Sequence, residues 1–114
     1  GLVTTTMKIK SKPDEVKRVI RAGIKASRYI KANRDATIQF LMEWQRIDKE
    51  IATGTYEYLS KATNESGSLS EDGFRLMIEE IKELAKVSRD VPLTDLADLS
   101  ILRVAQKELG IGGN

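Results

Sequence analysis

Apolar residues recur every three or four positions along most of the chain, which is the period of an amphipathic helix. The first such run predicts a helix from Pro13 to about Ala32, with two acidic residues in its first turn, where negative charge favours a helix start. Its predicted buried stripe holds Val16, Val19, Ile20, Gly23, Ile24, Ser27 and Ile30. Because Gly23 and Ser27 are small, we expect a neighbouring element to approach closely there.

Two shorter helices are predicted next, each preceded by a residue that favours a helix N-cap. Asn33 precedes a helix over 34–46, and Asp48 precedes a helix that runs to about residue 62. The predicted inward positions are Thr37/Ile38, Leu41 and Trp44/Gln45 in the first, and Ile51, Thr55, Tyr58/Leu59 and Ala62 in the second. A loop over 64–67, rich in turn-forming residues, ends this pair.

The clearest helix start in the sequence lies at residues 68–74. Ser68 and Glu71 have the spacing of a capping box, whereas Ser70 as the cap places Leu69 and Phe74 as a hydrophobic staple. We favour Ser70, because two acidic residues then occupy the first turn. The helix is expected to end near residue 87, with inward positions Phe74, Met77/Ile78, Ile81 and Leu84/Ala85.

A last helix is predicted towards the C-terminus, with Thr94 or Asp98 as its cap. Its inward positions are Leu99, Leu102, Ala105/Gln106 and Leu109. Gly110 then stands where a left-handed C-cap belongs. We expect the tail over 111–114 to be frayed.

The N-terminal residues follow a different pattern. Residues 2–9 contain Val3, three threonines and Ile9, and β-branched residues favour a short strand, which Lys12-Pro13 would end. A lone strand leaves its backbone groups unpaired, so we expect it to pair with a missing part of a larger protein or with a second copy. The expected fold is mostly α, about five helices plus one short N-terminal strand, in a single partial domain, 1–114: a strand or arm at 1–12, a helical segment at 13–110 and a tail.

Composition and charge limit the classes of function that we expect. The 114 residues carry 19 basic and 17 acidic side chains, and the formal net charge of +2 is too even to favour a nucleic-acid or membrane partner. The charges do separate, because residues 1–50 hold 12 basic and 6 acidic residues and residues 51–114 hold 7 and 11. Without Cys the chain has no cysteine nucleophile, and without His it lacks the commonest general base and the commonest metal ligand. We therefore expect no enzyme activity, no cofactor and no metal, and we find no signal-peptide pattern.

Several residues could form a functional site, but we expect an ordinary structural role for each of them. Trp44 is expected in the core, and of Tyr56 and Tyr58 at least one is expected to be exposed, because they lie on different helix faces. A solvated acidic cluster is expected at Glu79, Glu80 and Glu83, helix capping at Asp95 and Asp98, and a solvated basic face at Lys17, Arg18, Arg21, Lys25, Arg28 and Lys31. Residues 110–113 resemble a phosphate loop but follow a helix instead of preceding one.

The order of the motifs is that of a known family. The stretches that carry the likeness are residues 2–5 (LVTT), 12–18 (KPDEVKR), 32–36 (ANRDA), 67–74 (GSLSEDGF) and 91–100 (VPLTDLADLS). Together they resemble the C-terminal part of substrate-binding proteins of ABC importers, in the nitrate/sulfonate/bicarbonate (taurine-type) group. The resemblance implies a two-lobed α/β fold of the type II periplasmic-binding class, a periplasmic or extracytoplasmic address, and an ABC permease and a small solute as partners of the full-length parent.

The expected function is therefore that of a C-terminal segment of such a binding component, which would not bind solute on its own. No ligand residue is carried over, since the family's contacts lie mostly upstream. A homo-oligomer formed by pairing or swapping of the N-terminal strand is expected. The alternative is a self-sufficient helical interaction or dimerisation domain with residues 1–12 as a flexible arm.

Overall fold

The computed structural model describes residues 2–68 and 70–112. Over these residues the chain forms seven helices and no strand. They are α1 (Thr6–Ser11), α2 (Pro13–Ala32), α3 (Arg34–Gln45), α4 (Lys49–Ala62), α5 (Glu71–Ala85), α6 (Leu93–Leu96) and α7 (Ser100–Glu108). The expected helices at α2, α3, α4 and α5 are confirmed, and the expected α/β fold is wrong for the residues described.

The predicted N-terminal strand is the largest correction. Thr6–Ser11 is helical, and Thr5 caps it by accepting a hydrogen bond from the backbone N–H of Lys8 at 3.1 Å. Lys8 and Lys12 both pair with Glu15 at the start of α2, the second of them at 3.3 Å. β-propensity is weak without a partner strand, so a capped helical turn held by ion pairs replaces it. Oligomerisation by strand pairing loses its structural basis.

The helix starts differ in how they are capped. Asp48 accepts a hydrogen bond from the N–H of Ile51 at 2.9 Å, and Ser70 accepts one from Gly73 at 3.2 Å, as predicted for both. Asn33 was predicted to cap α3, but its side-chain amide instead donates to the carbonyl of Tyr29 at the end of α2. The proposed staple involves Leu69, which lies outside the described residues.

The predicted last helix is divided into α6 and α7. Asp98 accepts a hydrogen bond from the N–H of Ser100 at 2.9 Å, which places its carboxylate at the start of α7. Gly110 has a φ of 69°, so it occupies the left-handed position predicted for it. The predicted frayed tail includes residues 113–114, which lie outside the described part.

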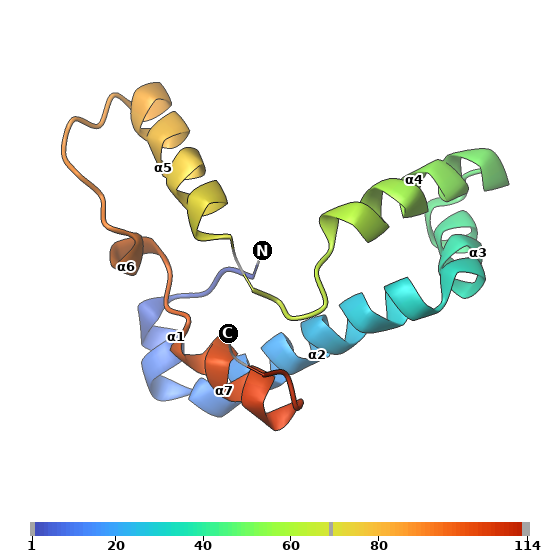
Figure 1. The fold of residues 1–114 in the computed structure, drawn as a ribbon, viewed down its shortest axis with the longest axis horizontal. Helices are drawn as coiled ribbons and strands as arrows, with labels where there is room; N and C mark the ends of the chain where they lie inside the picture. The colour runs from blue at the N-terminus through green and yellow to red at the C-terminus, as the bar shows by residue number, and fades with distance from the viewer. Residues whose placement is uncertain (1, 69, 113–114) are drawn as a thin grey trace.

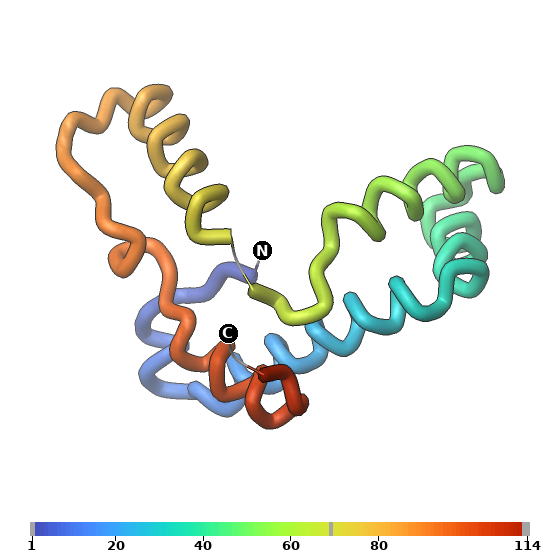
Figure 2. Tube along the Cα trace, in the orientation of Figure 1, coloured from blue at the N-terminus to red at the C-terminus, as the bar shows by residue number. Residues whose placement is uncertain are grey.

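The helices are arranged around α2 (Figure 1). One end of α2 carries α1 and α7, the other carries α3 and α4, and α5 stands apart from both groups. The Cα radius of gyration is 16.9 Å, whereas a compact domain of this length has about 13 Å. The open trace in Figure 2 shows the same arrangement, which leaves several helix faces without a neighbour.

Two small cores hold the structure together. At the α3–α4 corner, the buried residues are Ile38, Leu41, Ala52 and Tyr56, with Ile30, Met42 and Ile47 packed against them. At the α2–α7 contact, buried Ile24 lies beside Leu102 and the loop at Gly67. Gly67 has a φ of 71°, and a Cβ there would lie 3.1 Å from Ile24, so both its conformation and its surroundings favour glycine.

Candidate functional site

The exposed apolar side of α5 is the most unusual surface of the molecule. Met77, Ile81 and Leu84 were predicted to face inward, yet they are 41%, 52% and 84% exposed. Only Ile78 of this helix is buried, and Phe74 is half-buried. The amphipathic pattern was therefore recognised correctly, but the neighbour that the pattern implies is not among the described residues.

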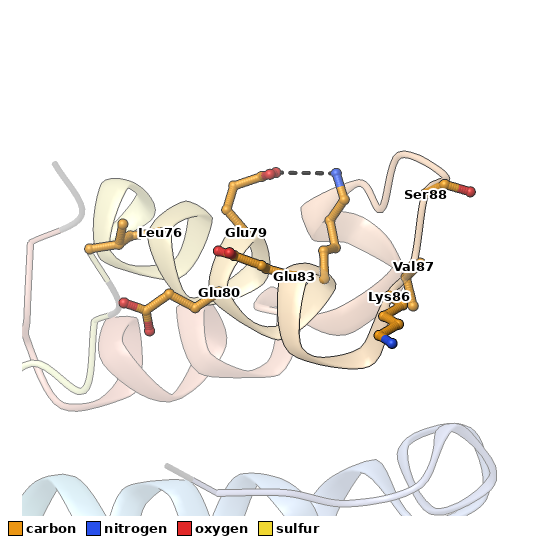
Figure 3. A pocket seen from close by; sticks show the side chains of 8 residues that line it. Leu76, Glu79, Glu80, Glu83, Lys86, Val87 and Ser88 are labelled. Atoms are coloured by element: carbon orange, nitrogen blue, oxygen red, sulfur yellow. Dashed lines mark hydrogen bonds and ion pairs between the residues drawn. The ribbon is translucent and has the colours of Figure 1, made fainter.

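The acidic cluster of Glu79, Glu80 and Glu83 lies beside this stripe on α5. Figure 3 shows a shallow hollow along this helix, lined by Leu76, Glu79, Glu80, Lys82, Glu83, Lys86, Val87 and Ser88. All eight residues come from α5 and the turn that follows it, so no second element closes the hollow over a ligand. Glu79 pairs with Lys82 at 3.3 Å. Within the described residues, no group of three or more carboxylates is placed to hold a metal ion.

The aromatic residues divide between core and surface. Trp44 was predicted to be buried, and this is wrong, since it is 69% exposed and stacks on exposed Phe40 with ring centroids 5.8 Å apart. α3 packs against α4 through Ile38 and Leu41, and Trp44 lies beyond this contact. The Phe40–Trp44 pair was not predicted, but its signal was the spacing of four residues, which brings such side chains together on a helix.

The two tyrosines of α4 occupy opposite environments, as predicted. Tyr58 is 73% exposed, whereas Tyr56 is 6% exposed, donates to the carbonyl of Lys31 at 3.5 Å and lies under the Arg34 guanidinium. The inward stripe predicted for α4 is shifted by one position, because buried Ala52 and Tyr56 carry the contact in place of Ile51 and Thr55.

Part of the basic face of α2 has a structural role. Lys17 and Arg21 donate to the two oxygens of Glu108 on α7, at 2.9 and 2.8 Å. The hydrogen bond from Lys17 holds the pKa of the Glu108 carboxyl below its usual value, and the same contact raises the pKa of Lys17. Lys31 pairs with Glu65 at 3.8 Å, and Arg28 donates to the Glu65 carbonyl.

The rest of the basic face lacks such partners. Arg18 and Lys25 are exposed and form no ion pair within the described part of the chain. A solvated basic face was predicted, and for these two side chains that prediction is confirmed.

The remaining candidates serve local structure. The hydrogen bonds from Ser100 lower the pKa of the Asp98 carboxyl. Asp98 was predicted as a helix cap, but the N-cap position of α7 is Leu99, so Asp98 holds the turn before the helix instead. Asp95 is exposed in the short helix α6. The resemblance of 110–113 to a phosphate loop includes Gly113, which lies outside the described residues.

A polar contact that sequence reasoning did not find joins α7 to the loop before α5. The amide of buried Gln106 donates to the Ser66 carbonyl at 2.9 Å and to the Ser68 hydroxyl at 3.0 Å. Asn64 also donates to the Ser68 carbonyl. These bonds join the loop at residues 64–68 to α7.

The total surface agrees with these local observations. The accessible surface is 8860 Å², whereas a compact monomer of 12.7 kDa exposes about 6,200 Å². The surplus of roughly 2,600 Å² on this one chain is comparable to one partner's share of a large obligate protein–protein interface. No described helix is long and apolar enough to span a membrane.

Comparison of the chain with protein-family models, with curated proteins and with solved structures finds no match.

Proposed function

We propose that this chain is the C-terminal helical segment of the substrate-binding component of an ABC importer, in the nitrate/sulfonate/bicarbonate group. The remainder of that component covers the apolar faces that are exposed here. The observation that carries the proposal is the surplus surface of roughly 2,600 Å², because a segment cut from a larger body exposes the area that the body would cover.

The importer class comes from the order of the sequence motifs. The stretches at 12–18, 32–36, 67–74 and 91–100 all surround helix starts. The proposal does not require residues 2–9 to be a strand, since these motifs lie mainly in helices and in the turns between them.

The role proposed for the segment is architectural. It has no catalytic function, and the solute is captured by the remainder of the component outside the cytoplasmic membrane and passed to an ABC permease. The hollow on α5 is lined by this helix and the following turn alone. This observation supports the assignment of solute binding to the remainder of the component.

The native product tests this proposal. An antibody against residues 68–90 would be used on extracts of the source cells, and the captured species weighed by mass spectrometry. A species much heavier than 12.7 kDa, with additional sequence before residue 1, is expected. A native product of 12.7 kDa would contradict the proposal, because no covering body would then be joined to the segment.

A self-sufficient helical interaction domain is the second candidate. It is favoured by the α3–α4 corner, where Ile38, Leu41, Ala52 and Tyr56 form a core without any sheet. On this account the native product has a mass of 12.7 kDa, and its exposed faces bind a separate protein. Capture of the 12.7 kDa species by itself or with a stoichiometric partner would support this candidate.

A further inference from the structure

We propose that two copies of the 114-residue chain form a two-fold dimer in which α5 of each copy docks on α2 of the other. The contact joins an apolar stripe with acidic neighbours, on α5, to a small-residue face with basic neighbours, on α2. This inference rests on the second candidate function, the self-sufficient chain, because in a larger binding component the remainder would cover the same two faces.

The α5 side of the contact is a stripe of large apolar residues. Met77, Ile81 and Leu84 are exposed, and Glu80 lies on the same side as Met77 and Leu84, three and four residues away. Glu80 and Glu83 form no ion pair within the described residues. The helix carries five acidic and two basic residues, a net charge of −3.

The α2 side is a face of small residues. Ala22, Gly23 and Ala26 are exposed, and a Cβ added to Gly23 would meet only the side chain of Leu2 within 4 Å, at 3.9 Å. Arg18 and Lys25 lie beside Ala22 at helical spacing, and neither has an ion-pair partner in the described part. The helix carries six basic and two acidic residues, a net charge of +4.

The α5 stripe and the α2 face complement each other in side-chain size and in charge. A helix with small residues allows a close approach, and the large side chains of α5 would fill the space that these residues leave. Two α5 helices facing each other would place like charges together, whereas α5 against α2 places opposite charges together. The charge pattern therefore selects α2 as the partner of α5.

The partner is a second copy because α5 and α2 of one chain lie apart, so that neither face covers the other within a single copy (Figure 1). A two-fold axis would form the contact twice, and the surplus of roughly 2,600 Å² exceeds the about 800 Å² per partner of a standard interface.

Sedimentation equilibrium of the full chain tests the proposal. We expect a reversible dimer of twice 12.7 kDa. Glu80→Lys with Glu83→Lys should weaken dimerisation at least about tenfold, because each reversed charge acts twice in a symmetric dimer. Arg18→Glu with Lys25→Glu should do the same, and the chain with all four substitutions should recover the dimer. Glu43→Lys with Glu50→Lys is the matched control, which changes two exposed acidic residues outside both helices.

A second pair of variants tests the apolar contact independently. Ala26→Gln keeps a good helix former but fills the small-residue face, so it should weaken the dimer, whereas Ala36→Gln on α3 should not. Circular dichroism would check that every variant keeps its helix content. A monomer at all concentrations, or a dimer that the α2 and α5 variants weaken no more than their controls do, would overturn the proposal.

Discussion

The α3–α4 corner and the α5 helix have similar sequence patterns and very different surroundings. Both regions have apolar residues at helical spacing and a side-chain cap at the helix start. At the corner, Ile38 and Leu41 are buried against Ala52 and Tyr56. On α5 a single apolar side chain is buried and most of the stripe is exposed.

The difference shows which part of folding the pattern encodes. Helical spacing determines which face of a helix is apolar. The stabilisation, however, comes from the neighbour that buries this face. α3 and α4 are adjacent in the sequence and supply each other's neighbour through a short connection. α5 has long connections on both sides, and its neighbour must come from elsewhere. Three substitution experiments test the difference in packing between the α3–α4 corner and the rest of the chain.

The largest effect is expected from truncating a leucine in each region. Leu41→Ala should lower the free energy of unfolding by about 2–4 kcal/mol, because the side chain is buried and its loss leaves a cavity. Leu84→Ala should change it by less than about 0.5 kcal/mol in dilute solution, since that side chain is exposed. Urea denaturation monitored by circular dichroism measures both. Equal losses would mean that α5 is packed as well as the corner.

An intermediate effect is expected from removing the two helix caps. Asp48→Ala should destabilise the corner by about 1 kcal/mol, because the N–H of Ile51 loses its acceptor. Ser70→Ala removes the same kind of bond from α5 and should lower helix content without shifting the main unfolding transition. Thermal melts followed by circular dichroism distinguish the two responses, and a matching drop in melting temperature for Ser70→Ala would contradict this account.

The smallest effect is expected from pH, and it concerns the α2–α7 contact. The pKa of Glu108 is lowered in the folded state by Lys17, so its stabilising contribution is complete above the ordinary glutamate pKa and is lost as pH falls through the lowered value. Glu108→Gln should flatten this part of the acid dependence of the melting temperature. Glu43→Gln, on α3, is the control and should leave the dependence unchanged.

The sequence predicted local structure more accurately than burial. The bounds of α2 and the caps at Asp48 and Ser70 follow from short-range chemistry, and the structure confirms them. The N-terminal strand was wrong because β-branching alone does not supply a partner strand, and a cap at Thr5 favoured a helix. The α/β fold class inferred from the family resemblance was wrong for the described residues for the same reason, since they contain no strand.

The candidate surface was only partly predictable. The sequence pattern predicted the apolar stripe on α5. It could not predict that the stripe is exposed, because exposure depends on the position of every other element. Trp44 was placed in the core for its size and position, and the structure leaves it on the surface because α4 covers only one part of α3. A close approach by a neighbour was similarly expected at Gly23, which is exposed among the residues that the structure describes.

Hydrogen exchange of the dilute chain tests most directly the claim that none of the described residues covers the apolar stripe of α5. The account predicts slow exchange for buried amides of α3 and α4, and fast exchange throughout Glu71–Ala85 that becomes slower when a covering partner binds. Amides of α5 that are protected in the dilute monomer as strongly as those of the corner would contradict it, because the stripe would then be covered within a single copy.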